Sequence, residues 1–283
     1  MDDLTLKVDG VQIPCILYGT AWKEEETQRL IELALRQGFH GIDTANQRRH
    51  YDEAAVGRAI ATTIESGLAG RDELFLQTKF TFRNGQDHRL PYDPAESISV
   101  QVEQSFASSL AHLGVKRIDS YLLHGPMQRV GLTSGDWEAW AAMELIQERG
   151  GARFLGISNV SLEQLHALWE KARIRPRFVQ NRCYANRGWD RPVREFCTVN
   201  GMVYQGFSLL TANRDLLARP GLVRIAKRHG RTVSQIVFRF ATQIGMIALT
   251  GTSDIQHMRE DLKTTEFQID PDEIKTIEEL RPS

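Results

Sequence analysis

The sequence predicts a closed (β/α)8 TIM barrel that forms a single domain over residues 1–283. Short β-rich runs alternate with longer segments of helical periodicity, and eight such runs occur. Each run is mostly apolar rather than strictly alternating, as expected of parallel strands covered by helices. A Rossmann fold would carry GxGxxG after its first strand, and no run is followed by that motif. Eight βα units in 283 residues therefore favour a barrel over an open doubly wound sheet.

The predicted elements follow one another along the whole chain. Residues 4–13 form a β-hairpin, because Asp9-Gly10 in its middle is a favoured two-residue turn, and the hairpin is expected to cap the barrel floor. The eight barrel strands are expected at 16–20, 41–45, 74–79, 118–124, 154–159, 178–183, 202–207 and 246–251. Helices are expected at 24–37, 53–66, 95–113, 136–149, 162–173, 191–200, 233–244 and 272–280.

Composition excludes several classes of function. Lysine and arginine number 35 against 36 aspartates and glutamates, so a broad basic surface for nucleic acid is not expected. The three cysteines, Cys15, Cys183 and Cys197, are odd in number and form no CxxC motif, which favours buried thiols over disulfides or a zinc site. The polar, acidic start and the lack of an apolar run of about 18 residues predict a soluble cytoplasmic protein without a membrane span.

Ionisable and amide side chains stand at the ends of four predicted strands. Asp43, Lys79, His124 and Asn159 end the second to fifth strands. Each alone has a structural explanation, such as a helix cap for Asp43 or a satisfied core histidine for His124. The carboxyl ends of barrel strands meet at one rim, where catalytic residues of this fold collect. An uncompensated buried charge is costly, so Asp43 and Lys79 are expected to form an ion pair.

Seven short stretches, in order, connect the chain to a known family. They are residues 18–20 (YGT), 41–45 (GIDTA), 53–57 (EAAVG), 74–79 (LFLQTK), 119–124 (DSYLLH), 156–159 (GISN) and 180–181 (QN). Over nearly its whole length the chain resembles the aldo-keto reductases. The likeness is closest to a bacterial and fungal branch with the motifs DTANQ…HYxE and YQxF…LTAN, found here at 43–53 and 204–213.

The resemblance implies a catalytic tetrad of Asp43, Tyr51, Lys79 and His124. When hydride adds to a carbonyl carbon, negative charge grows on the oxygen and a proton must be donated there. The tyrosine would be the acid, and the lysine, paired with the aspartate, would lower the pKa of the phenol. The histidine would orient the carbonyl.

The position of the tyrosine departs from the family pattern. The family places it five residues after the aspartate and three before the glutamate, where this chain has Arg48 and His50. Tyr51 is the only phenol in a loop that is two residues longer, so it is assigned as the acid. The alternative is that His50, or no residue, donates the proton.

The resemblance also implies a nicotinamide nucleotide as cofactor. Ser158, Asn159 and Gln180 would hold the carboxamide, and Phe207 would stack on the ring. Thr20 and Asp43 would complete that end, and Ser208 and Leu210 would begin the pyrophosphate loop. The adenosine end would involve Gly251, Thr252, His257 and Asp261. The resemblance favours NADP. NAD remains possible, because Gly251 and His257 stand where relatives have cations that bind the 2′-phosphate.

The function predicted from these residues is NAD(P)H-dependent reduction of a small-molecule aldehyde or ketone. Trp22 and Phe80 are the expected walls of the substrate pocket. The alternative is a nucleotide-binding regulatory or redox-sensing protein with little turnover. A metal-dependent hydrolase would need paired histidines on a strand, and no predicted strand carries them, so no metal is expected. The natural substrate and the oligomeric state are not predicted.

Overall fold

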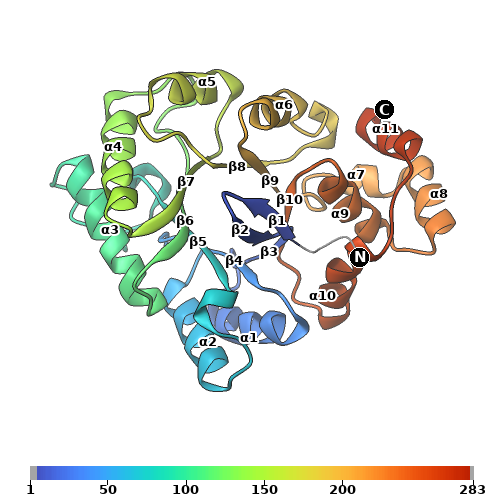
Figure 1. The fold of residues 1–283 in the computed structure, drawn as a ribbon, viewed down its shortest axis with the longest axis horizontal. Coiled ribbons are helices and arrows are strands. Elements are labelled where there is room, and N and C mark those ends of the chain that lie inside the picture. The colour runs from blue at the N-terminus through green and yellow to red at the C-terminus, as the bar shows by residue number, and fades with distance from the viewer. Residues whose placement is uncertain (1–4, 281–283) are drawn as a thin grey trace.

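The computed structural model describes residues 5–280 and contains the predicted barrel. Eight parallel strands close on themselves in the order β10-β3-β4-β5-β6-β7-β8-β9, with helices around them (Figure 1). The strands are β3 (Ile16–Gly19), β4 (Gly41–Asp43), β5 (Phe75–Phe80), β6 (Ile118–Leu123), β7 (Ala152–Ser158), β8 (Phe178–Arg182), β9 (Val203–Phe207) and β10 (Ile247–Thr250). Each lies within one or two residues of its predicted range, so the fold class is confirmed.

The helices confirm the predicted pattern and add to it. They are α1 (Thr27–Gln37), α2 (Glu53–Glu65), α3 (Ile98–Leu113), α4 (Ser134–Glu148), α5 (Leu162–Lys171), α6 (Arg191–Val199), α7 (Arg214–Leu217), α8 (Pro220–His229), α9 (Val233–Gln243), α10 (Ile255–Leu262) and α11 (Pro271–Glu279). The predicted helix ranges do not include the segments of α7, α8 and α10. Helix α8 begins with a proline, which suits a first turn, and buries Leu222, Ile225 and Ala226 on one face.

The predicted N-terminal hairpin closes one end of the barrel. Strands β1 (Thr5–Val8) and β2 (Val11–Pro14) pair antiparallel, and the turn residues Asp9 and Gly10 have φ angles of 48° and 84°. Leu4, the first residue of the predicted hairpin, lies outside the described residues. Val8 and Ile13 are buried against the phenylalanines of the lower barrel interior. In Figure 1 the hairpin lies across the centre of the barrel.

The barrel interior is arranged in layers two residues apart along the strands. Side chains at positions i and i+2 of a strand point to the same face. On β5 this places Phe75, Gln77 and Lys79 in succession, all buried. The lowest layer is apolar and contacts the hairpin, and the layer above it contains glutamines from three strands. The polar end is therefore the end opposite the hairpin.

The outer shell is packed by helices that approach one another closely. A Cβ at Gly57 of α2 would lie 2.0 Å from the carbonyl oxygen of His112 at the end of α3, so only glycine fits there. This explains the glycine of the 53–57 motif as a packing residue. All three cysteines are buried, as predicted.

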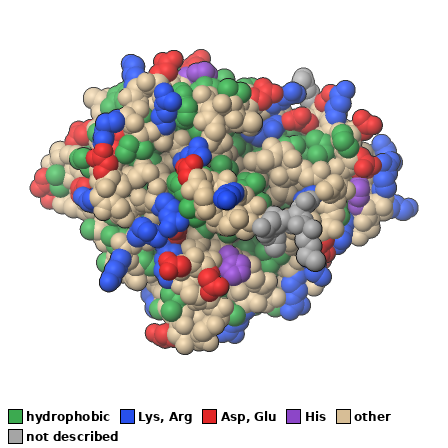
Figure 2. All heavy atoms as spheres, in the orientation of Figure 1, with side chains coloured by type: hydrophobic (Ala, Val, Ile, Leu, Met, Phe, Trp, Pro, Cys, Tyr) green, Lys and Arg blue, Asp and Glu red, His purple; other side chains and the backbone are tan. Residues whose placement is uncertain are grey.

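The surface carries both signs of charge. On the face seen in Figure 2, acidic and basic side chains lie intermixed rather than in one broad area of a single sign. Within residues 5–280, no helix is both long and apolar enough to cross a bilayer.

Candidate active site

The ion pair predicted at the barrel mouth is present. Lys79 Nζ donates to both carboxylate oxygens of Asp43, each at 2.7 Å, and to the carbonyl oxygen of Thr44 at 2.8 Å. The two side chains are 1% and 4% exposed. Burial lowers the pKa of Lys79, and the carboxylate of Asp43 opposes that fall. These three oxygen acceptors match the three N–H groups of an ammonium.

The longer loop after β4 returns Tyr51 to this pair. Residues 48–50 form a turn, which the Tyr51 backbone N–H closes on the carbonyl of Gln47 at 3.0 Å. The Gln47 side chain anchors the loop by donating to the carbonyl of Gly85 at 2.7 Å. The turn absorbs the additional residues, and Lys79 Nζ lies 5.6 Å from the centroid of the Tyr51 ring. The shifted spacing in the sequence therefore leaves the phenol beside the lysine.

The Tyr51 hydroxyl is free to act on a ligand. The hydroxyls of Tyr18, Tyr92 and Tyr204 each donate to an oxygen of the protein. The Tyr51 hydroxyl makes no hydrogen bond among residues 5–280, and the residue is half-buried, whereas the Tyr121 hydroxyl, which also lacks a partner there, is fully buried in the core. These properties suit a group that donates to something outside the protein.

The expectation that the lysine lowers the pKa of this phenol is wrong. Burial raises the pKa of Tyr51, and the charge of Asp43 raises it further. Desolvation is the larger of these two causes. Tyr51 therefore keeps its proton at neutral pH, as a proton donor must.

His124, at the end of β6, contacts the same group. Its ring centroid is 6.0 Å from that of Tyr51, and its Nδ1 lies 2.6 Å from the hydroxyl of Thr81. Burial, followed by the charge of Lys79 and then that of His50, lowers the pKa of His124 to about 3. The imidazole is therefore neutral at neutral pH. When Thr81 donates to Nδ1, the ring proton lies on Nε2 and can be donated to a ligand.

Three residues predicted to hold the nicotinamide carboxamide lie next to one another. Ser158 Oγ donates to the carbonyl of Gln180 at 2.7 Å, and Asn159 Nδ2 donates to Ser158 Oγ at 3.1 Å. Gln180 Nε2 donates to Asp43 Oδ1 at 3.0 Å, which joins this cluster to the ion pair. Asn159 has a φ of 53°, and its side chain also donates to the carbonyl of His124. The positions after β7 and on β8 are thus linked to the tetrad.

The other residues predicted at this end have distinct environments. Thr20 is fully buried, and its hydroxyl donates to the backbone carbonyl of Asp43. Phe207, Ser208 and Leu210 are half-buried at the end of β9 and in the loop that follows. Ser208 has a φ of 57°. Phe207 packs against the apolar cluster of the barrel interior and remains partly exposed.

The predicted adenosine end after β10 is more open. Gly251 and His257 are exposed, and Thr252 Oγ1 accepts from the backbone N–H of Asp254, the residue before α10. Asp261 is buried and accepts from Thr250 Oγ1 at 2.6 Å, and burial raises its pKa to about 7. Its carboxylate faces the strand, so the structure does not bring it to the cofactor position.

One cation near this loop was not identified from the sequence. Lys23 Nζ donates to the carbonyl of Gly251, and burial lowers the pKa of its ammonium. Lys23 directly follows Trp22 after β3, and β3 is paired with β10 in the closed barrel. That pairing is the signal that could have placed the lysine beside the loop after β10.

The two predicted substrate-pocket residues differ in placement. Trp22 is 69% exposed, and its ring lies 3.8 Å from that of His50, centroid to centroid. Phe80 is fully buried, and its ring packs against Phe82 and Tyr92. The structure therefore does not bring Phe80 to the pocket: its position after Lys79 points it into the shell between strand and helix, whereas Lys79 points inward.

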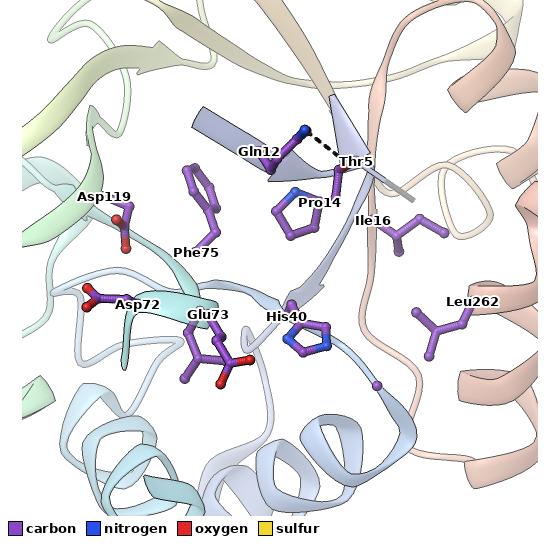
Figure 3. Close-up of a pocket in the computed structure, with 12 residues that line it drawn as sticks. Thr5, Gln12, Pro14, Ile16, His40, Asp72, Glu73, Phe75, Asp119 and Leu262 are labelled. Carbon is purple, nitrogen blue, oxygen red and sulfur yellow. Dashed lines mark hydrogen bonds between the residues drawn. The ribbon is translucent and has the colours of Figure 1, made fainter. Parts of the chain in front are cut away.

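A separate cavity of about 330 Å³ lies at the opposite end of the barrel, beside the hairpin (Figure 3). Among its lining residues, Asp119 accepts from Arg71 at 2.7 Å and from the Leu76 backbone N–H at 3.0 Å. Glu73 accepts from the Gly70 backbone N–H at 2.7 Å. These carboxylates stabilise the floor, and none of the tetrad lines this cavity.

Curated relatives match the chain almost end to end. An aldo-keto reductase of Melia azedarach, "7-acetyl-epi-neemfruitin B aldo-keto reductase", is 26% identical over 98% of this chain and 88% of its own length. "Uncharacterized oxidoreductase YtbE" of Bacillus subtilis (strain 168) is 28% identical over 96% of this chain and 90% of its own.

Solved structures share the fold. The Bombyx mori aldo-keto reductase AKR2E4, solved in complex with NADP, has a TM-score of 0.81 at 24% identity and covers 97% of this chain and 91% of its own. An aldo-keto reductase from a deep-sea metagenome library, MGS-M4, has a TM-score of 0.84 at 23% identity and covers 98% and 94%. The model of the Aldo/keto reductase family matches residues 16–282. With all eight barrel strands inside that match, the chain belongs to the aldo-keto reductase family.

Proposed function

We propose that this protein reduces an aldehyde or ketone to the alcohol with NADPH, with Tyr51 as the general acid. The observation that supports this most strongly is the geometry around the phenol. A tyrosine hydroxyl without a partner among residues 5–280 lies beside a buried Lys79–Asp43 pair and a neutral His124. This combination supplies a proton and stabilises an oxyanion at the barrel mouth.

The residues at the barrel mouth fit a nicotinamide nucleotide. Gln180 uses both amide hydrogens within the protein, so its carbonyl oxygen is left as an acceptor for a carboxamide N–H. The half-buried ring of Phe207 offers a flat apolar face for stacking. When bound, the reduced nicotinamide supplies hydride to the carbonyl carbon. We also assign Ser158 and Asn159 to this end.

Each member of the tetrad has one role. His124 donates from Nε2 to the carbonyl oxygen and orients it. Tyr51 donates its proton to that oxygen as charge grows there, and the phenolate that remains lies near the Lys79 ammonium. Asp43 holds Lys79 in its charged form and in place. The raised pKa of Tyr51 keeps the proton on the phenol until it is needed.

We assign NADP rather than NAD as the preferred cofactor. A silkworm member of the family was solved with NADP. In this chain Lys23 supplies positive charge beside Gly251, Arg259 projects from α10, and the α10 N-terminus follows Thr252. Arg259 donates to Gln37 at 2.8 Å and would have to exchange that partner for a phosphate. The expected substrate is a small carbonyl compound that passes the Trp22–His50 pair.

The test is a titration of the purified protein with NADPH and with NADH, followed by tryptophan fluorescence. Nicotinamide absorbance is then followed after addition of a panel of aldehydes and ketones. Tighter binding of NADPH together with turnover supports the proposal. Binding without turnover across a broad panel would favour a nucleotide-sensing protein, and binding of neither nucleotide would refute both.

A further inference from the structure

Three glutamine side chains and one carboxylate form a closed network beneath the tetrad. Gln77 of β5, Gln180 of β8 and Gln205 of β9 come from three strands, and Gln77 and Gln205 are fully buried. Asp43 Oδ1 accepts from Gln77 Nε2 at 2.7 Å and from Gln180 Nε2 at 3.0 Å, in addition to Lys79. The amides thus lie one layer below the lysine.

The Asp43 carboxylate sets the direction in which the Gln77 and Gln180 amides point, and Gln205 holds the second hydrogen of each. An ionised carboxylate only accepts hydrogen bonds, so Gln77 and Gln180 must turn their nitrogens towards it. The second N–H of each then donates to Gln205 Oε1, at 2.8 and 2.9 Å. Gln205 Nε2 donates back to Gln77 Oε1 at 3.0 Å, so Gln77 and Gln205 bond reciprocally across the barrel interior. No other assignment of oxygen and nitrogen satisfies these contacts.

The network leaves only the side-chain oxygen of Gln180 available to a ligand at the barrel mouth. Both of its amide hydrogens are used, by Asp43 and by Gln205. Its oxygen Oε1 has no partner within residues 5–280 and is not sealed from solvent. We propose that Gln77 and Gln205 are positioning residues for nucleotide recognition: they lock Gln180 with its carbonyl oxygen towards the ligand, where it accepts the carboxamide N–H of nicotinamide. This inference rests on the proposed NADP-dependent function.

Stability alone does not explain why two glutamines, Gln77 and Gln205, are buried in the barrel interior. Two amides placed in a barrel interior lose their hydration, and their mutual hydrogen bonds only compensate for that loss. Apolar side chains of similar volume would fill the same space without a need for partners. The pair does what apolar side chains cannot: Gln205 Oε1 holds the second hydrogen of Gln180, so the Gln180 amide cannot rotate to present N–H groups to the ligand.

The experiment compares binding of NADP⁺ with binding of its analogue in which an acetyl group replaces the carboxamide. The analogue keeps the carbonyl but lacks the N–H donors. Both dissociation constants are measured by tryptophan quenching, and melting temperatures are measured in parallel. The proteins are the wild type, Gln77→Leu, Gln205→Leu, the double variant, and Gln180→Leu, which lacks the proposed acceptor. Gln101→Leu is the matched control, since Gln101 is a buried glutamine of α3 that donates to Glu96.

We expect wild type and Gln101→Leu to prefer NADP⁺ by about 3- to 10-fold, the range of one neutral hydrogen bond. We expect both single variants to lose this preference and to melt at lower temperature, because each leaves its partner amide unsatisfied. The double variant should regain much of the lost melting temperature while its preference stays absent, as in Gln180→Leu.

If Gln77 and Gln205 had a purely structural role, the double variant would regain both its melting temperature and its preference for NADP⁺ over the analogue. That result would overturn the inference. So would a wild type that binds both nucleotides equally. If the wild type binds neither, the proposed function fails and the inference fails with it. Tight binding of NADP⁺ with a preference that no glutamine variant changes would overturn the inference alone.

Discussion

The two ends of the barrel contain similar polar residues but use them differently. At the floor, Arg71 and Asp119 form an ion pair at 2.7 Å, and the carboxylate also accepts a backbone N–H of β5. At the mouth, Lys79 and Asp43 are paired at the same distance, but beside them lies the Tyr51 ring, whose hydroxyl makes no hydrogen bond to the described part of the chain. The floor also has the cavity of about 330 Å³ (Figure 3).

The difference shows that neither a cavity nor an ion pair identifies the site. At the floor the charged groups are satisfied by one another and by backbone, and the hairpin closes the barrel there. At the mouth, the Tyr51 hydroxyl and the Gln180 side-chain oxygen have no hydrogen-bond partner within residues 5–280, whereas the ion pair and the glutamine amides beneath them are hydrogen-bonded to one another. Free polar atoms on a rigid support are what substrate recognition requires.

Of the substitutions that distinguish the mouth of the barrel from its floor, Lys79→Met should have the largest effect on kcat/KM. We expect kcat/KM to fall by about 10²–10⁴-fold, because the phenolate left after proton transfer loses its charged neighbour. Steady-state kinetics with NADPH measure this, and Lys227→Met, at an exposed lysine of α8, is the control.

The single change leaves Asp43 buried without its cation, which threatens folding. The double variant Asp43→Asn/Lys79→Met removes both charges and should be folded by circular dichroism yet equally impaired. A folded double variant with wild-type kcat/KM would contradict the role of the pair.

A smaller effect is expected at the support of His124. Thr81→Val removes the hydroxyl that lies 2.6 Å from Nδ1 and that, by donating there, would keep the ring proton on Nε2. We expect kcat/KM to fall about 5- to 10-fold, which corresponds to one hydrogen bond. Thr81→Ser keeps the hydroxyl and should recover most of the activity. Equal losses in both variants would show that packing of the methyl group, and not the hydrogen bond, matters there.

At the floor the expected effect is on stability only. Asp119→Ala removes the only charged hydrogen-bond partner of Arg71 among residues 5–280 and leaves the buried Leu76 N–H without its acceptor, so we expect the free energy of unfolding to fall by about 1–3 kcal/mol. Urea denaturation measures it, with the exposed Asp72→Ala in the same cavity as control. We expect kcat/KM to stay within about twofold of wild type, as for a surface change. A large kinetic loss without a stability loss would place function at the floor.

The smallest expected effect is in the pH dependence. Because the pKa of His124 is lowered to about 3, the imidazole stays neutral, and log kcat/KM should show no inflection near 6.5, the ordinary histidine value. The folded pKa lies below the unfolded one, so this group costs stability progressively as pH falls from about 6.5 towards 3. An acid limb near 6.5 that survives in His50→Gln would contradict a neutral His124.

Sequence reasoning predicted the barrel, the hairpin and the position of the ion pair because each follows from a local signal. Apolar runs mark the strands, Asp9-Gly10 marks the turn, and strand ends locate the rim. Phe80 was misplaced, although the two-residue period that puts Lys79 inward puts its neighbour outward. The same period, counted back from Lys79 and Phe207, reaches Gln77 and Gln205, so these residues could have been found. The pKa of Tyr51 could not, because it depends on burial by a folded loop.

The most direct measurement compares kcat/KM for one aldehyde in wild type, Tyr51→Phe and His50→Gln, with NADPH binding measured in each. We expect Tyr51→Phe to bind NADPH normally and to lose about 10²–10⁴-fold in kcat/KM, while His50→Gln retains most of its activity. The reverse pattern, a nearly normal Tyr51→Phe beside an inactive His50→Gln, would contradict the assignment of Tyr51 as the acid.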